Sequence, residues 1–327
     1  MFRRWMPAAG LLAGAALLWW VVERAGGIPW HRLGAVWPVV LMTLAWFMLP
    51  LFAAAASWRA LFSPRRRPPL GRAIYLTWIG LGVNWLLPVA MVGGEIVKYR
   101  LGRWPGGSGP ALIASLIGDK TQQAISQILF ALAGLGLLST FHNSSGVFFR
   151  STWLFVILGL AAYLFYRAQQ AGAASALAAR FNRGLANGER ARWTPRRIDA
   201  EIRALYRRQA GWWRALAWRL LFRLLFAAEI VFVFVYFDIE WTVTQILVME
   251  SLAQGARGAA FLIPAGLGAQ EGALIGAGLW LGLPGEALLV AALVKRAREW
   301  LAGGAALLVW HIEEGRKLLR RSDPGRL

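Results

Sequence analysis

The sequence predicts an all-α polytopic membrane protein, a single membrane domain over residues 1–327 with about six full spans and two re-entrant helical hairpins. Three observations lead to this fold class. Hydrophobic residues make up 58% of the chain, and several apolar runs reach the roughly 20 residues that cross a bilayer. The Lys and Arg residues gather in the loops between those runs, as the positive-inside rule predicts for cytoplasmic loops.

The composition excludes several classes of function. The net charge of +20 would indicate nucleic-acid binding in a soluble protein, but membrane topology explains basic residues in loops, so nucleic acid is not an expected partner. The chain has no cysteine, which excludes disulfides, thiolate chemistry and iron–sulfur ligation. Its 3 histidines lack metal-ligand spacing, and no P-loop or hydrolase motif is present. We expect no metal and no cofactor.

The first half of the chain, residues 1–140, is predicted to form a span, a second span, a hairpin and a third span. Arg3 and Arg4 hold the start of the first span in the cytoplasm. A basic loop places the end of the second span on the same side, and Pro38 and Pro50 are expected to bend that span. In order, the predicted elements are the spans 5–22 and 35–62, the basic loop 63–72, the re-entrant hairpin 73–101 and the long span 110–140.

Residues 151–311 are predicted to repeat this order in inverted topology. A cytoplasmic, Arg-rich segment at 167–214 follows the first span of this half, and its part from 195 to 213 is expected to be an amphipathic helix on the membrane surface. The basic tail at 312–327 is also expected in the cytoplasm, together with the N-terminus. The remaining predicted elements are the spans 151–166 and 217–237, an outer turn 238–241, the hairpin 242–284 and the last span 286–310.

The two halves align at a single offset of 176 residues, which carries Pro88 onto Pro264 and Glu95 onto Glu271. Because each half has an odd number of full crossings, the second copy must be inverted. Inverted repeats with broken helices, and with a site at the interface of the repeats, are the architecture of many transporters. The same offset takes Asp119, Lys120 and Gln123 onto Lys295, Arg296 and Glu299.

Two polar interruptions of apolar sequence mark the tips of the predicted hairpins. The first break is NWLLPVAMVGGEIVK at 84–98, and the second break is LIPAGLGAQEG at 262–272. A plain transmembrane helix has no reason to carry proline, glycine and a carboxylate so close together, so we look for function at these breaks. Their candidate site residues are Asn84, Pro88, Gly93, Gly94 and Glu95 in the first break, and Pro264, Gly268 and Glu271 in the second.

Charged residues next to each break complete the candidate site. Glu95 and Glu271 each open a new half-helix, where a carboxylate caps the positive helix end or faces a cationic head group. Charges at membrane depth usually face a partner or a wet cavity, and arginine binds phosphate with parallel hydrogen bonds. We therefore take Lys120 and Arg296 as candidate phosphate contacts, with ion pairing to Asp119, Glu95 or Glu271 as the structural alternative. The other candidates are Asp119, Gln123, Lys295 and Glu299.

Some charges in apolar sequence could be neutralised by other residues of the chain. Lys295 and Glu299 are four residues apart and could neutralise each other on one helix face. Glu229 is isolated within its predicted span, where it could meet one of the arginines.

Four stretches carry a family resemblance: VNWLLPVAMVGGEIVKYRL, ASLIGDKTQQAISQILFALAGL, FLIPAGLGAQEGALIGAGLWLGLP and LVKRAREWLAGGAALLVWHIEE. With them the chain resembles the lysylphosphatidylglycerol synthase transmembrane family, also called flippase-like, over nearly its whole length. It is most similar to the hopanoid-biosynthesis-associated branch. The resemblance implies a bacterial inner-membrane protein with a lipid-related function. In bifunctional members the membrane domain moves an aminoacylated phospholipid between leaflets and a separate soluble domain makes that lipid, so only lipid handling is implied here.

These observations predict a lipid-binding and translocating protein, not an enzyme, that handles hopanoid-related, anionic or aminoacylated lipids. The expected partners are membrane lipids, with proteins of hopanoid biosynthesis or lipid export and a second copy of the chain as further candidates. Two alternatives stay open. One is a membrane-embedded lipid-modifying enzyme in which Glu95, Asp119 and Glu271 supply acid–base chemistry. The other is a scaffold of a hopanoid biosynthesis complex.

Overall fold

The described part of the chain is helical throughout. The computed structural model describes residues 34–87, 93–102, 104, 109–140, 195–259 and 266–322, with the single positions 16, 19 and 23. These residues contain no strand, which confirms the all-α class for them. The predicted span 151–166, almost all of the predicted span 5–22, and the two break prolines Pro88 and Pro264 lie outside the described residues.

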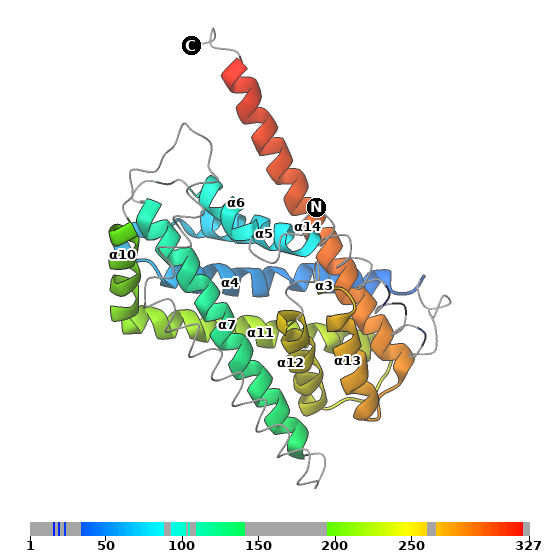
Figure 1. Ribbon diagram of the computed structural model, residues 1–327. Helices are drawn as coiled ribbons and strands as arrows, with labels where there is room; N and C mark the ends of the chain where they lie inside the picture. The colour runs from blue at the N-terminus through cyan, green and yellow to red at the C-terminus, as the bar shows by residue number, and fades with distance from the viewer. Residues whose placement is uncertain are drawn as a thin grey trace, which may run out of the picture.

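The two longest described helices run obliquely past the rest of the molecule (Figure 1). They are α7 (Gly109–Thr140) and α14 (Gly285–Ser322). The other described elements are α3 (Trp37–Trp46), α4 (Met48–Ala60), the short 3-10 turn η1 (Pro64–Arg66), α5 (Leu70–Leu86), α6 (Gly93–Leu101), α10 (Pro195–Arg207), α11 (Gln209–Tyr236), α12 (Val243–Ala259) and α13 (Ala269–Trp280).

The predicted span 35–62 is a helical rod interrupted at Phe47, between α3 and α4. Pro50 has no N–H to donate to the C=O of Trp46, four residues earlier, so the ladder of backbone hydrogen bonds is incomplete there. The C=O of Phe47 still accepts the N–H of Leu51 at 3.0 Å, and α3 and α4 continue along nearly one line (Figure 1).

Helices α4 and α11 pack side by side through the middle of the molecule (Figure 1). The hydroxyl of Ser57 donates to the C=O of Ala215 across this interface at 2.8 Å. The outer helices pack across the two halves of the chain, because α5 lies against α14 and α12 lies against α7. Gly82 and Gly303 meet at the first of these crossings, where a Cβ atom on Gly82 would lie 3.0 Å from the C=O oxygen of Gly303. Small residues at such crossings let membrane helices approach closely.

Helices α5 and α6 form the first hairpin, and its tip is closed by Asn84. The side-chain oxygen of Asn84 accepts the N–H of Gly94 at 2.9 Å, which satisfies one of the free donors at the start of α6. Gly94 lies against the backbone of Gly80, and a Cβ atom at Gly94 would also lie 2.7 Å from the amide nitrogen of Asn84. The glycine of the first break is therefore required by close packing of the two arms.

Helices α12 and α13 form the second hairpin, and glycine is required there for a different reason. Gly266 and Gly268 have φ angles of +63° and +77°, which side chains rarely tolerate. The carboxylate of Glu271 accepts the N–H of Gly268 at 2.9 Å, so Glu271 caps the start of α13, which is one of the two roles that the sequence left open for it.

The two hairpins open toward opposite ends of the α4–α11 pair. Helix α5 starts just after α4 ends, beside the start of α11, whereas α12 starts where α11 ends. The base of the first hairpin is joined by Arg72, which donates to the C=O of Leu101 at 2.6 Å. The base of the second is joined by Gln245, which donates to the C=O of Leu281 at 3.4 Å.

Helix α10 lies across the end of α4 and α11 rather than alongside them (Figure 1). Its apolar residues Ile198, Ile202 and Leu205 are buried, and they pack with α7 and neighbouring residues. Its basic residues are exposed, and Arg66 of η1 pairs with Glu201 of α10 at 2.7 Å. The sequence predicted an amphipathic helix on the membrane surface. The helix is amphipathic, but its apolar face contacts protein.

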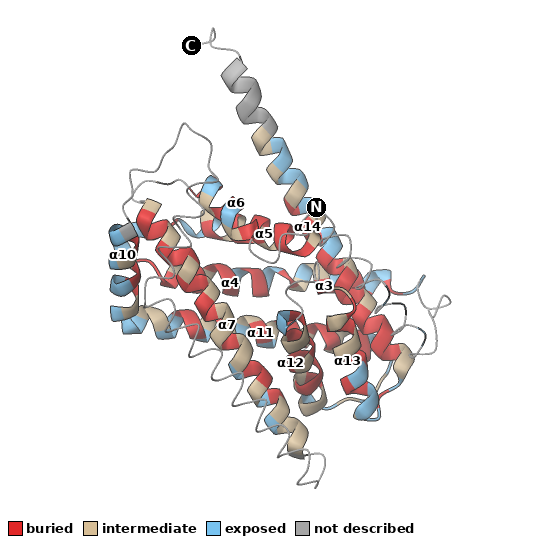
Figure 2. Ribbon diagram, in the orientation of Figure 1, coloured by how far each residue is buried: buried red, intermediate tan, exposed pale blue. Residues whose placement is uncertain are grey.

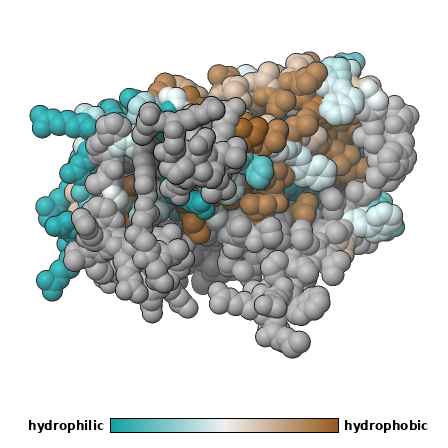
Figure 3. All heavy atoms as spheres, turned by 90° about the horizontal axis from the view of Figure 1, so that it is seen from above, coloured by the Kyte–Doolittle hydropathy of each residue, from teal (hydrophilic) through white to brown (hydrophobic). Residues whose placement is uncertain are grey.

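Buried residues gather on the inward faces of the helices (Figure 2). Large apolar side chains remain exposed on the outward faces, and a space-filling view shows a patch of hydrophobic residues, with hydrophilic residues at one end of the molecule (Figure 3). The stretches Trp37–Ala60 and Gly109–Ser139 are the two in the described residues that are long and apolar enough to cross a membrane. Exposed apolar side chains on the first of these include Leu41, Met42, Met48, Leu49 and Phe52.

Candidate functional site

Charged side chains fill the interior between the two hairpins, α7, α11 and α14. Burying a charge is costly unless it is paired and hydrogen-bonded, so their partners define what this interior can do. The buried charged residues are Lys98, Asp119, Arg219, Arg223, Glu229, Glu250, Arg257, Glu271, Lys295, Arg296, Arg298 and Glu299.

At the tip of the first hairpin, Glu95 pairs with Lys120 of α7, with 2.9 Å between the Lys120 Nζ and a carboxylate oxygen. Lys120 also donates to the side chain of Gln123 at 3.1 Å, and the amide of Asn84 donates to Glu95 at 3.5 Å. The structure therefore brings four of the candidate residues together, and it places Lys120 in the ion pair that was the alternative to phosphate binding.

Directly before Lys120 on α7, Asp119 holds two cations at once. Lys98 of α6 lies 3.3 Å from one carboxylate oxygen, and Arg219 of α11 donates to the other. Gln123 also donates to Asp119 at 3.4 Å. Arg219 was not predicted as a site residue, although it lies two residues inside the predicted span 217–237, close to the Arg-rich segment.

The second half contains a matching ion pair. Arg296 of α14 donates through its Nε to Glu271 at 2.9 Å and through Nη1 to Glu299 at 3.1 Å. Arg257 of α12 also pairs with Glu299, and it donates to Gln270 at 2.8 Å. Arg296, the other candidate phosphate contact, is therefore held by two carboxylates.

A third group of charges lies between α11, α12 and α14. Lys295 pairs with Glu250 at 2.6 Å, and Arg298 pairs with Glu229 at 2.8 Å. The prediction that Glu229 meets an arginine is confirmed. The suggested pairing of Lys295 with Glu299 is wrong, although a spacing of four residues puts them on one helix face. Lys295 pairs instead with Glu250 of α12, and Glu299 pairs with Arg257 of α12.

Arg223 links the two halves of this network without a carboxylate partner among the described residues. Its guanidinium donates to the Gln254 side chain at 2.5 Å, to the Ser126 hydroxyl at 2.9 Å and to the C=O of Gln123 at 2.7 Å. Sequence reasoning missed Arg223. Its spacing of four residues from Arg219, within an apolar run, is the signal that could have found it.

A cavity of about 130 Å³ lies where the tips of both hairpins meet α7 and α11. Four predicted site residues, Asn84, Glu95, Lys120 and Gln123, line it. Its charged lining comprises the cations Lys98, Lys120, Arg219, Arg223 and Arg257 and the carboxylates Glu95 and Glu250. The other described candidates are not part of this lining: Gly93 and Gly94 start α6, Gly268 caps α13, and Asp119, Glu271, Lys295, Arg296 and Glu299 belong to the ion-pair network.

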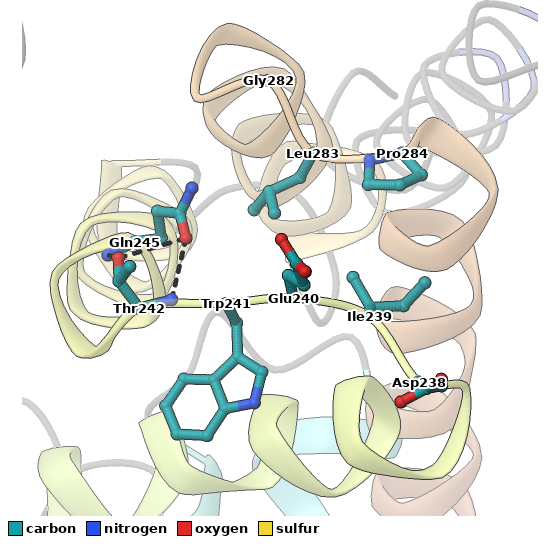
Figure 4. A pocket seen from close by; sticks show the side chains of 9 residues that line it. All are labelled: Asp238, Ile239, Glu240, Trp241, Thr242, Gln245, Gly282, Leu283 and Pro284. Atoms are coloured by element: carbon teal, nitrogen blue, oxygen red, sulfur yellow. Dashed lines mark hydrogen bonds between the residues drawn. The ribbon is translucent and has the colours of Figure 1, made fainter.

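A second, open hollow of about 870 Å³ lies at the C-terminal end of α11, the end away from α10 (Figure 4). It is formed by the turn between α11 and α12 and by the turn between α13 and α14. Asp238 there has a positive φ of 53°, and the N–H of Thr242 donates to the side chain of Gln245 at 2.8 Å at the start of α12. The sequence predicted only a tight turn at this place.

The comparisons agree with a lipid-related membrane protein. Residues 8–306 match the family described as the lysylphosphatidylglycerol synthase TM region. Comparison with curated proteins and with solved structures gave no match. A match over nearly the whole chain shows the family, and it agrees with the apolar helices and the buried ion pairs described above. The chain therefore belongs to the lysylphosphatidylglycerol synthase transmembrane-region family, and it is a membrane protein with a lipid-related role.

Proposed function

We propose that the protein binds a lipid head group in the cavity between the hairpin tips and helps that lipid to cross between the leaflets of the bacterial inner membrane. The observation that carries this proposal is the cavity itself. Its lining is mostly buried and strongly charged, and it comes from both halves of the chain, including both hairpins. A charged site within apolar helices is costly to maintain and usually marks a substrate pathway.

An inverted repeat is part of the proposal, and the helix boundaries support it. The offset of 176 carries the start of α6 at Gly93 onto the start of α13 at Ala269, and the start of α7 at Gly109 onto the start of α14 at Gly285. The same offset carries α5 onto α12 and α7 onto α14. The packing of α5 on α14 therefore corresponds to the packing of α12 on α7. The two hairpins also open to opposite ends, as two re-entrant hairpins of an inverted repeat would. The complete fold would then have six full spans.

The ion pairs at the hairpin tips follow the same offset. Glu95 pairs with Lys120 in the first half, and Glu271 pairs with Arg296 in the second. We propose that these pairs are gates, each of which holds one hairpin closed until a head group competes for its charges. Alternating opening of two symmetric gates around a fixed site is the usual mechanism of inverted-repeat transporters.

The proposed orientation places η1, α10 and both termini in the cytoplasm, because the exposed arginines gather at that end. The cargo is proposed among hopanoid-related lipids and anionic or aminoacylated phospholipids, as the family resemblance implies, with hopanoid biosynthesis or lipid-export proteins and a second copy of the chain as partners. Transport is favoured over lipid modification because the carboxylates that an enzyme would use, Glu95, Asp119 and Glu271, are all held in ion pairs.

Reconstituted proteoliposomes test the proposal. Lipid with a fluorescent head group is added to both leaflets, and a reductant that cannot cross the bilayer measures how much reaches the outer leaflet. We expect the wild type to speed this transfer, and Lys120→Ala and Arg296→Ala to slow it at least tenfold. Arg203→Ala on α10 removes an exposed positive charge and serves as the control. Equal rates for vesicles with and without the protein would contradict the proposal.

A further inference from the structure

We propose that the central cavity is an oxyanion site, in which Arg219, Arg223 and Arg257 bind one phosphate group of a lipid head group. This inference rests on the proposed function and names its cargo as a phospholipid rather than an uncharged lipid. The three arginines come from α11 and α12, are at least nine-tenths buried, and line the same cavity.

The first argument is the excess of positive charge. Lys98 and Arg219 share the single carboxylate of Asp119, and Arg223 has no carboxylate partner among the described residues. Both excess charges therefore belong to groups that line the cavity. An unneutralised charge that is 4% exposed, as Arg223 is, destabilises the fold unless an anion accompanies it.

The second argument is the set of unused hydrogen-bond donors. In the described part of the chain, the Nε of Arg219 and the Nε and Nη2 of Arg257 are buried without a hydrogen-bond partner. Buried donors are nearly always satisfied in proteins, because leaving one unpaired costs about 1–3 kcal/mol. A phosphate brings several strong acceptor oxygens, and the arginine fork matches its geometry.

The third argument is size. A volume of about 130 Å³ equals that of roughly four water molecules in the liquid. A phosphate group fits such a space, whereas the acyl chains of the lipid do not, so they would remain in the bilayer. The cavity therefore suits recognition of the charged part of the lipid alone.

The site is also asymmetric, in contrast to the gates. The residues that stand 176 positions before Arg219, Arg223 and Arg257 are Thr43, Phe47 and Leu81, none of which is charged. The three arginines of the site thus come from the second half of the chain only. One anion per chain is expected, bound on the α11–α12 side of the cavity.

Thermal unfolding of the full-length protein in nanodiscs tests this assignment. The discs are made of digalactosyl diacylglycerol, a lipid without phosphate, and contain either phosphatidylglycerol or glucosyl diacylglycerol, whose head group also carries no phosphate. In a third arm, the discs that contain glucosyl diacylglycerol are measured in a buffer in which inorganic phosphate replaces chloride at equal ionic strength. We expect phosphatidylglycerol to raise the melting temperature of the wild type by several degrees relative to glucosyl diacylglycerol. We expect Arg223→Met to lose that rise and Arg223→Lys to keep part of it.

Controls make each outcome decisive. Arg203→Gln removes an exposed charge and should retain the full rise. Arg223→Met removes an unneutralised buried charge and should therefore fold. The comparison of wild-type melting temperatures among the three arms tests the site without this variant. Equal melting temperatures in all three arms would overturn the site, and a rise with inorganic phosphate alone would overturn the lipid as its source.

Transport measurements separate this inference from the proposed function. If labelled phosphatidylglycerol crosses the bilayer faster than labelled glucosyl diacylglycerol, the phosphate assignment is supported. Equally fast protein-dependent crossing of both would overturn the phosphate assignment and leave translocation standing. Binding of phosphatidylglycerol without protein-dependent crossing would leave the site standing and overturn translocation.

Discussion

At the scale of single residues, the interior is governed by which cation each carboxylate holds. Glu229 is fully buried, and it pairs with Arg298, which is also fully buried. Arg298 lies over the rings of Phe47, Trp85 and Phe226, with the guanidinium carbon 4.6 Å from the centre of the Phe226 ring. The Glu229 carboxylate and the faces of three aromatic rings thus together stabilise the buried charge of Arg298.

Glu229→Gln should destabilise the protein strongly. The substitution leaves Arg298 without its carboxylate, and removing one partner of a buried ion pair costs about 3–5 kcal/mol. Thermal unfolding in detergent measures the loss, and the exposed Glu240→Gln is the matched control. The double variant Glu229→Gln, Arg298→Met should recover much of the loss, because no unpaired charge remains. A single variant as stable as the wild type would contradict this account of the pair.

Some residues of the site could be predicted from the sequence and others could not. Proline, glycine and carboxylate in one apolar stretch are conspicuous, so the sequence selected Asn84, Glu95 and Glu271 as candidates. Arg219 and Arg223 were missed because apolar residues surround membrane helices on every side. The sequence of such a helix does not show which face points inward, and therefore does not show which charges meet.

At the scale of elements, the two hairpins reach similar shapes by different means. The first depends on contact between Gly94 and the backbone of Gly80, and the second on the positive φ angles of Gly266 and Gly268. The sequence predicted both tips from their composition. It did not predict that the apolar face of α10 packs with α7, because amphipathic periodicity is the same whether a helix faces lipid or protein.

Gly94→Val should open the first hairpin. The added side chain would overlap the C=O of Gly80 and the amide of Asn84, which are parts of the packed arms. Overpacking of this kind costs about 1–3 kcal/mol and more where the backbone must move. We expect a lower melting temperature and faster proteolysis near the tip. Gly276→Ala, at a position with open space around it, should leave both unchanged; equal behaviour of the two variants would count against the close approach.

At the scale of the whole molecule, the proposed orientation rests on the distribution of charge. Exposed arginines gather around α10 and η1, whereas Asp238 and Glu240 lie at the other end of α11. The sequence alone indicated these sides through the positive-inside rule. The crossing of α5 with α14 and of α12 with α7 was beyond the sequence, because weak identity at one offset does not specify contacts between the halves.

Labelling of single cysteines tests the proposed orientation, because the natural chain contains none. Glu240→Cys should react in intact spheroplasts with a maleimide that does not cross membranes. Arg203→Cys should react only after the membrane is opened, because it lies at the basic end. Labelling of both from the same side would contradict the orientation.

The central claim is that the two tip pairs gate a lipid path, and exchange of the charges in one pair tests it most directly. Glu95 and Lys120 lie 2.9 Å apart, so the double variant Glu95→Lys, Lys120→Glu keeps an ion pair, whereas each single variant leaves two like charges together. Transbilayer movement of labelled phosphatidylglycerol is measured for all three in proteoliposomes. The account predicts that both single variants lose transport and that the double variant regains a large part of it. Wild-type rates in both single variants would contradict it.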